Sequence, residues 1–138
     1  MHKYMEIAIK EARKAYKKGE VPVGAVIVCN DKILAKAHNN RKKSNLTIGH
    51  AEMLAINIAN RKKKTWILDD CELYVTLEPC MMCAGAIVES RIKKIYCNLT
   101  KTNSCSIKWL EENNVQVIKD ETSSETTLLL QSFFQKKR

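Results

Sequence analysis

The sequence lacks any long apolar run. No stretch of its 138 residues approaches the roughly 18 consecutive apolar residues that a membrane-spanning helix needs. The segment from Met1 to Glu6 lacks the apolar centre of a secretory signal peptide. Only four glycines and two prolines are present, and no linker, internal repeat or low-complexity segment is found. We therefore expect a single domain over residues 1–138, located in the cytoplasm and without a membrane partner.

Acidic residues are in the minority. The chain has 24 Lys and Arg against 15 Asp and Glu, which gives a formal net charge of +9. A basic surface of this kind favours polyanions such as nucleic acids. A proteome rich in lysine and asparagine would give the same excess, so the charge alone does not decide between these interpretations.

Cysteine is the residue present in excess, with six copies. Three disulfides would fit a secreted protein, but nothing in the sequence directs secretion, and cytosolic thiols stay reduced. Cys80 and Cys83 have the spacing of metal ligands. Three others lie in apolar, strand-like runs and are interpreted as small buried side chains: Cys29, Cys71 and Cys97. Cys105 has no assigned role.

Strands alternate with helices after an opening hairpin. Helical spacing of apolar residues predicts helices at Met5–Tyr16, Ala51–Ala59, Cys80–Ser90, around Trp109–Leu110 and at Thr122–Phe134. Apolar, β-prone runs predict strands at Val21–Val28, Ile33–Ala37, Leu73–Leu77, Ile92–Cys97 and Val115–Ile118. The polar segment Asn39–Gly49 is predicted to be a loop. This order predicts a three-layer α/β/α domain with a mixed sheet of about five strands flanked by helices.

The most specific feature is a histidine and two cysteines around one carboxylate. His50-Ala51-Glu52 is followed later by Pro79-Cys80-Met81-Met82-Cys83. One imidazole and two thiolates suit zinc, and three protein ligands leave the fourth tetrahedral position to water, as in catalytic sites. Glu52 is placed to exchange protons with that water without being a ligand. The pair of motifs H-x-E and P-C-x-x-C is the signature of zinc-dependent nucleobase deaminases.

The predicted local structure is compatible with this site. Cys80 and Cys83 share a face at the start of a helix, where N–H groups and the helix dipole stabilise thiolates. Because each residue of a helix turns by about 100°, His50 and Glu52 would point apart within a regular helix. We therefore expect His50 to lie in the irregular first turn.

A purely structural zinc site is the alternative for the same ligands. Its fourth ligand would have to come from elsewhere in the chain: Cys71, Cys97 or His38. Glu52 favours the catalytic interpretation, because a structural site does not need a carboxylate beside the metal.

Several segments carry a resemblance that runs nearly from end to end. They are Glu20–Val26, Asn39, His50–Glu52, Leu73–Ile87, Ser90–Ile92 and Leu128–Arg138. The run from Tyr74 to Gly85 is the longest and most specific. With these segments the chain resembles the bacterial tRNA-specific adenosine deaminases, within the cytidine and deoxycytidylate deaminase superfamily.

The resemblance implies a fold, a reaction and a set of roles. That family has the cytidine-deaminase fold, works as a homodimer and converts the wobble adenosine of a tRNA anticodon to inosine, releasing ammonia. It implies that His50, Cys80 and Cys83 hold Zn²⁺ and that Glu52 transfers protons. It further implies four substrate contacts: Asn39 on the flipped base, the backbone N–H of Ala51 at its reacting end, and Val23 and Leu77 as apolar walls. It implies RNA contacts from Lys136, Lys137 and Arg138.

Without the resemblance, two of these assignments have simpler interpretations. Asn39 alone would be a turn residue, and the basic segment Lys136–Arg138 would be a solvated tail.

One segment departs from the family pattern. From Cys97 to Ser106 the family's glycines are missing, and Lys101 falls where an aspartate near the sugar of the target nucleotide is expected. A carboxylate accepts a hydrogen bond from a sugar hydroxyl, whereas an ammonium only donates. This departure motivates an alternative function, deamination of a free base or nucleoside such as guanine, cytosine or cytidine. A non-catalytic RNA-binding partner of another deaminase is a third possibility, against which Glu52 argues.

Overall fold

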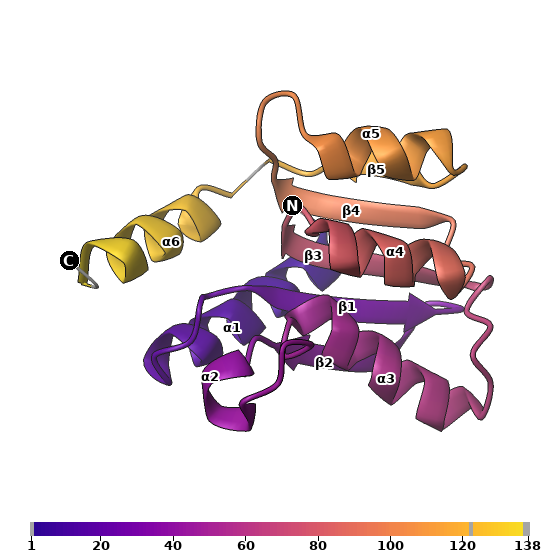
Figure 1. Ribbon diagram of the computed structural model, residues 1–138, viewed down its shortest axis with the longest axis horizontal. Coiled ribbons are helices and arrows are strands. Elements are labelled where there is room, and N and C mark those ends of the chain that lie inside the picture. The colour runs from indigo at the N-terminus through magenta and orange to yellow at the C-terminus, as the bar shows by residue number, and fades with distance from the viewer. Residues whose placement is uncertain (1, 122, 137–138) are drawn as a thin grey trace.

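The computed structural model describes residues 2–121 and 123–136 as alternating helices and strands (Figure 1). In chain order these are α1 (Lys3–Lys17), β1 (Gly24–Cys29), β2 (Lys32–His38), α2 (Arg41–Ser44), α3 (Ala51–Lys63), β3 (Cys71–Leu77), α4 (Met81–Glu89), β4 (Lys94–Leu99), α5 (Cys105–Glu112), β5 (Gln116–Lys119) and α6 (Glu125–Lys136). Within these two ranges no helix combines the length and the apolarity that crossing a membrane requires.

The five strands form one mixed sheet in the order β2-β1-β3-β4-β5. β1 runs antiparallel to both β2 and β3, whereas β3, β4 and β5 are parallel to one another. The β1–β2 hairpin closes through Asn30 and Asp31, whose φ angles are 51° and 61°. Positive φ at both central residues is the geometry of a type I′ turn, which matches the twist of a hairpin. The predicted mixed sheet and opening hairpin are confirmed.

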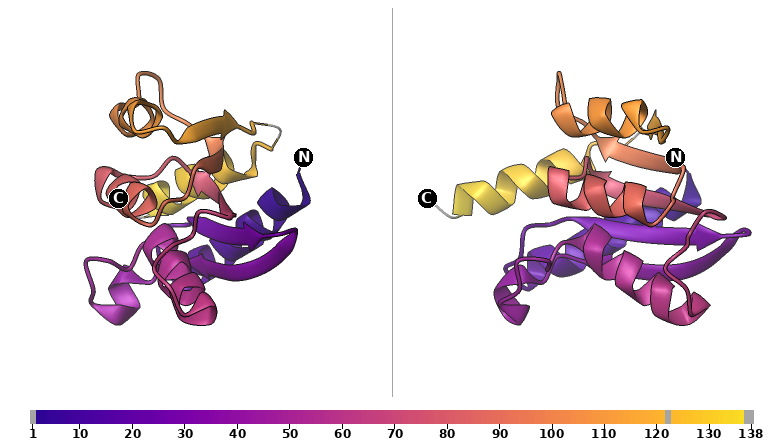
Figure 2. Two further views of the ribbon diagram at one scale, coloured as in Figure 1. Left: turned by 90° about the vertical axis from the view of Figure 1, so that its right-hand side faces the viewer. Right: turned by 45° about the vertical axis from the view of Figure 1, so that its right-hand side comes forward.

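Helices cover both faces of the sheet, which gives the predicted three layers (Figure 2). Side chains alternate along β1, as the pleat of a strand requires. Val26 and Val28 pack with residues of α1, whereas Ala25 and Ile27 pack on the other face with residues of α3, α4 and α5. On the α1 side, Arg13 of α1 and Glu125 of α6 form an ion pair. Figure 1 shows α6 extending away from the sheet toward the C-terminus.

Strand β1 begins three residues later than the apolar run suggests. Pro22 has no N–H to give to a sheet, so the ladder begins beyond it. The first strand residue, Gly24, lies so close to α1 that a Cβ there would stand 1.9 Å from the carbonyl oxygen of Ala8. Glycine therefore allows α1 to pack directly against this end of β1, next to the predicted substrate residue Val23.

The predicted loop Asn39–Gly49 contains one helical turn, α2, so the loop prediction was wrong for Arg41–Ser44. The carboxylate of Glu20 accepts hydrogen bonds from the backbone N–H groups of Lys42 and Lys43, at 3.0 and 2.9 Å. An acceptor at a helix N-terminus satisfies N–H groups that have no partner within the helix. Because Glu20 lies before β1, about twenty residues from α2 in the sequence, residues 39–49 alone do not predict this helical turn.

Candidate active site

The predicted zinc ligands lie at two neighbouring helix N-termini. His50 is the residue before α3 and has an extended backbone, with φ −95° and ψ 144°. This confirms that His50 lies outside the regular helix, while Glu52 lies in its first turn. Cys80 is likewise the residue before α4, and Cys83 lies in the first turn of that helix. β1 and β3 are adjacent in the sheet, and α3 and α4 pack on the same face of it. Segments distant in sequence therefore meet at one point.

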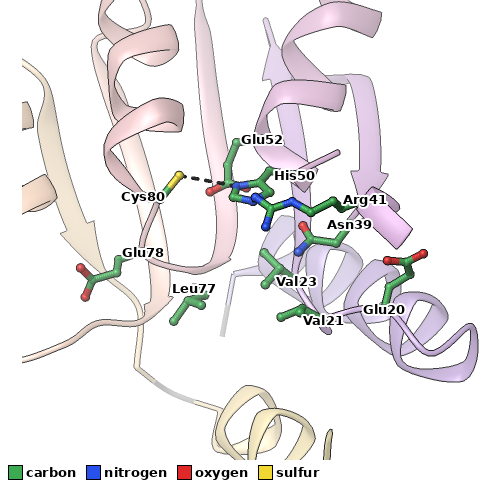
Figure 3. A pocket seen from close by; sticks show the side chains of 10 residues that line it. All are labelled: Glu20, Val21, Val23, Asn39, Arg41, His50, Glu52, Leu77, Glu78 and Cys80. Atoms are coloured by element: carbon green, nitrogen blue, oxygen red, sulfur yellow. Dashed lines mark hydrogen bonds between the residues drawn. The ribbon is translucent and has the colours of Figure 1, made fainter. Parts of the chain in front are cut away.

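The three ligand atoms form a compact triangle. His50 Nδ1 lies 3.5 Å from the Sγ atom of Cys80 and 3.5 Å from that of Cys83. All three atoms lie within 4.8 Å of one another, and Figure 3 shows Cys80 pointing toward His50. With Zn–S of about 2.3 Å and Zn–N of about 2.0–2.1 Å, tetrahedral geometry places sulfur and nitrogen about 3.5–3.6 Å apart. The donor set and its spacing therefore fit Zn²⁺.

The electrostatic surroundings of the ligands are compatible with a bound cation. Burial, and then the nearby Arg41 guanidinium, lower the pKa of His50 and favour the neutral imidazole that binds metals. Burial also raises the pKa of the Cys83 thiol, with the neighbouring Glu52 and Cys80 contributing. A thiolate at this buried position therefore needs a cation beside it, and a metal ion can supply that charge.

No fourth protein ligand completes the triangle in the described part of the chain. Among the three residues considered for that role, His38 contacts the Glu11 carboxylate at 2.9 Å. Cys71 donates to Asp70 instead, and Cys97, although buried, does not join the cluster. This arrangement supports a zinc site with an open position rather than a closed structural one.

Glu52 is buried beside the ligands, with only 4% of its surface exposed. Burial raises the pKa of its carboxyl to about 7, although hydrogen bonds, including one with Cys83, act in the opposite direction. A group with a pKa near neutrality is suited both to accept and to deliver a proton. The position and the environment of Glu52 thus fit a general acid–base residue.

A cavity of about 180 Å³ opens next to this cluster (Figure 3). Its lining includes six residues predicted from the sequence: Val23, Asn39, His50, Glu52, Leu77 and Cys80. The cavity is smaller than typical ligand pockets of roughly 300–1,000 Å³. It therefore suits one small ring system, with Val23 and Leu77 as apolar walls.

Two predicted substrate contacts are bonded to each other. The backbone N–H of Ala51 donates to Oδ1 of Asn39 at 2.7 Å, in a buried hydrogen bond. The Ala51 N–H thus already has an acceptor, while the Asn39 side chain lies in the cavity near Val23 and His50. Asn39 is consequently tied to the first turn of α3, which holds its amide in place for a base.

Sequence reasoning missed four residues of the cavity lining: Glu20, Val21, Arg41 and Glu78. Arg41 lies against His50 Nε2. Glu78 accepts hydrogen bonds from the backbone N–H of Lys101 and from the hydroxyl of Ser104. An available signal was the position of Glu78 directly before Pro79-Cys80. This position places a carboxylate between strand β3 and the ligand motif, next to the candidate site.

We expect Glu78→Ala to impair substrate binding more than zinc binding. Its carboxylate holds the segment Lys101–Ser106 next to the cavity, and hydrogen bonds to a charged group contribute about 1.5–3 kcal/mol each. Release of this segment should raise KM about tenfold or more, since 1.4 kcal/mol corresponds to tenfold. Steady-state kinetics and zinc analysis check this. Glu111→Ala, an exposed carboxylate of α5, is the control, and an unchanged KM for Glu78→Ala would contradict the positioning role.

Of the three predicted RNA-binding residues the structure describes Lys136, which is not part of the cavity lining. Lys136, the last residue of α6, has its Nζ 4.8 Å from the centre of the Tyr16 ring, a cation–π contact with α1. Lys137 and Arg138 lie outside the described residues. The RNA contacts of all three therefore stay a prediction.

The fold and the site together define a zinc-binding domain of the nucleobase deaminase class. Residues 1–99 match the cytidine and deoxycytidylate deaminase zinc-binding region, and the chain belongs to this family. It is 58% identical over 92 residues to the tRNA-specific adenosine deaminase of Bacillus subtilis (strain 168), an alignment that covers 67% of this chain. That alignment spans 57% of the relative, so the chain covers less than two thirds of its length. The predicted resemblance is confirmed.

Two solved structures are similar over most of the chain. One comes from a study of A-to-I editing by tRNA:A34 deaminases at the wobble position, with 32% identity and a TM-score of 0.84, covering 92% of this chain and 98% of that one. The other is guanine deaminase from Bacillus subtilis, with 34% identity and a TM-score of 0.70, covering 84% of this chain and 72% of that one. The cytidine-deaminase-like fold is therefore confirmed, and the zinc-binding family supports Zn²⁺ as the cofactor.

Proposed function

We propose that residues 1–138 form one zinc-dependent nucleobase deaminase domain that hydrolyses the wobble adenosine of tRNA to inosine. One observation carries the proposal. His50 and Cys80 of the ligand triangle, together with Glu52 and Asn39, line a cavity of the size of one base, in a chain that is similar along its length to a tRNA:A34 deaminase.

The metal ligands and Glu52 have different roles in the proposed reaction. His50, Cys80 and Cys83 hold Zn²⁺, which when bound supplies Lewis-acid activation of water for attack on the amine-bearing ring carbon. Glu52 removes a proton from the water and later delivers it to the departing amine, which leaves as ammonia. One carboxylate serves both steps because proton uptake and delivery alternate.

The cavity walls orient the base during these steps. Val23 and Leu77 face the ring as apolar surfaces, and Asn39 hydrogen-bonds its edge. Because the cavity accepts little more than one ring system, the target adenosine must leave the stack of the anticodon loop, as in other enzymes that act on bases in nucleic acids. Holding the base also excludes bulk water from Glu52.

We propose that the partner is the anticodon stem-loop of a tRNA in the cytoplasm. We also propose that a homodimer of this chain binds it. The charge of +9 favours the phosphate backbone. Three large apolar side chains near the zinc ligands are about half exposed and could pack against a second copy: Leu46, Ile48 and Met81. Light scattering at micromolar concentration tests the dimer, and a monomeric mass would contradict it.

A second candidate is deamination of free guanine. The similarity to guanine deaminase at 34% identity favours it, as does the altered segment around Lys101. The same zinc ligands and Glu52 would serve this reaction.

One experiment separates the two candidates. Zinc-loaded protein is incubated with a stem-loop carrying adenosine at the wobble position and, separately, with free guanine, adenosine, cytosine and cytidine. We expect inosine in the stem-loop and little ammonia from the free compounds. A stem-loop with guanosine at the wobble position and adenosine at the next position is the matched control. Ammonia from guanine with an unchanged stem-loop would contradict tRNA deamination and support the second candidate.

Replacing Lys136, Lys137 and Arg138 together by alanine should weaken tRNA binding and its dependence on salt. Each phosphate contact contributes about 0.7–0.9 to the slope of log affinity against log salt concentration, because it releases counterions. Binding titrations at several salt concentrations measure this slope. The same replacement of three exposed basic residues around the end of α3, Arg61, Lys62 and Lys64, is the control for general charge loss. A slope equal to that of the unmodified protein would exclude the tail from RNA contact.

A further inference from the structure

A second group of metal-binding side chains lies away from the active site. Cys29 at the end of β1 is paired in register with Cys71 at the start of β3, and Asp70 precedes Cys71. Both thiols donate to the same carboxylate, Cys29 to Oδ2 at 3.2 Å and Cys71 to Oδ1 at 3.4 Å. The three ligand atoms lie within 4.8 Å of one another. Two thiols and a carboxylate thus converge on one point.

This group is separate from the triangle at His50. Cys71 begins β3, whereas Cys80 and Cys83 follow its end. Six residue steps at about 3.3 Å each put the two ends of β3 about 20 Å apart. A metal ion bound at one end of β3 therefore cannot be coordinated by residues at the other end.

The interpretation of Cys29 and Cys71 as small buried apolar residues accounts for only part of their contacts. Cys71 is buried in the hydrophobic core and Cys29 is half-buried against it, but both thiols also donate to the carboxylate of Asp70. Cys97 fits that interpretation fully, because it is buried within the core and belongs to neither group of candidate metal ligands.

The charges of the group balance around a divalent cation. Lys63, at the end of α3, forms an ion pair with the carboxylate of Asp70. With both thiols deprotonated, two thiolates and one carboxylate would carry three negative charges. A divalent cation and the Lys63 ammonium supply three positive ones.

The donor types indicate which cation fits. Thiolate ligands select soft or borderline ions, among them zinc, over magnesium or calcium. Tetrahedral bonds of about 2.3 Å to two sulfurs place these about 3.8 Å apart, within the spread of the three ligand atoms. Asp70 is exposed, so the fourth position faces solvent and is available to water.

We propose that Cys29, Cys71 and Asp70 form a second site for a thiophilic divalent cation, with Zn²⁺ as the probe. The two S–H bonds break, two S–Zn bonds form and two protons pass to the solvent. No electron is transferred. The bound ion ties the end of β1 to the start of β3.

The test is a zinc titration of the protein that already holds one equivalent at His50, Cys80 and Cys83, in competition with a chromophoric chelator. We expect a second equivalent to bind, with release of about two protons. Cys29→Ser and Cys71→Ser should each weaken this second binding about 100-fold or more, beyond the 10–100-fold typical of changes around a ligand shell. Cys105→Ser, at an exposed cysteine outside both groups, should leave both equivalents in place.

Thiol protection provides a second measurement that does not depend on the variants. The second equivalent of Zn²⁺ should slow alkylation of Cys29 and Cys71 by iodoacetamide about tenfold or more, with Cys105 unaffected. Binding of only one equivalent in the unmodified protein, or alkylation of both cysteines at the same rate with zinc, would overturn the proposal. Formation of a Cys29–Cys71 disulfide in the presence of Zn²⁺ would also overturn it.

Discussion

Replacing Glu52 by glutamine is expected to lower kcat by about 10²–10⁴-fold, the full range that a general acid–base group contributes. The amide keeps the size of the buried side chain but cannot accept and return a proton. Since the proposed mechanism uses Glu52 in both proton transfers, we expect the loss to lie at the upper end of that range. Zinc should remain, because the three ligand atoms are untouched.

Single-turnover rates on the wobble stem-loop and zinc analysis of the same preparation measure the two effects separately. Glu89→Gln, at an exposed carboxylate on the last turn of α4, is the matched control and should retain full activity. A Glu52→Gln protein with zinc bound and kcat within tenfold of the unmodified protein would show that another group transfers the protons.

Replacing Cys83 by alanine is expected to remove the active-site equivalent of zinc and to reduce turnover to background. Cys83 is fully buried and is one of the two cysteines in the candidate ligand triangle of the described residues. Losing a direct ligand should lower zinc affinity by more than the 10–100-fold that changes around a ligand shell cause. Alanine is well tolerated within α4, so the helix itself should persist.

Zinc analysis, activity assays and thermal unfolding measure the effect of this replacement. A metal at about 1,000 times its Kd stabilises the folded protein by about 4 kcal/mol, so a strong chelator should lower the Tm of the unmodified protein. The same chelator should shift the Tm of Cys83→Ala less. Cys97→Ala is the matched control, because Cys97 is equally buried but lies outside the ligand triangle. Full zinc retention by Cys83→Ala would mean that the ligand set is different.

The candidate zinc ligands could be predicted because the spacing of histidine, glutamate and cysteine within two short motifs is typical of a zinc site. A histidine two residues before a glutamate, and two cysteines three apart after a proline, specify residues at the start of two helices. Elementary helix geometry even placed His50 outside the regular helix, as the structure confirms. The strands and helices were also visible, with ends displaced by a few residues where Pro22 or a distant cap intervened.

The supporting contacts of the site could not be predicted in this way. Glu20 caps α2, Arg41 reaches His50, and Glu78 holds the segment beginning at Lys101. Each joins parts of the chain whose proximity depends on loop conformation and strand order. The pattern of residues within one segment does not predict a contact with another segment. From the sequence, these residues were therefore indistinguishable from ordinary surface charges.

Short-range patterns in the chain were enough to predict the candidate ligand types, the candidate acid–base residue and the alternation of helices and strands, because each depends on residues close together in sequence. The folded sheet was needed to show that the order β2-β1-β3, with α3 and α4 on one face, brings His50 to Cys80 and Cys83 and that the β1–β3 pairing brings Cys29 to Cys71. Side-chain periodicity fixes which face a residue occupies. The packing of the whole sheet fixes which distant residue it meets.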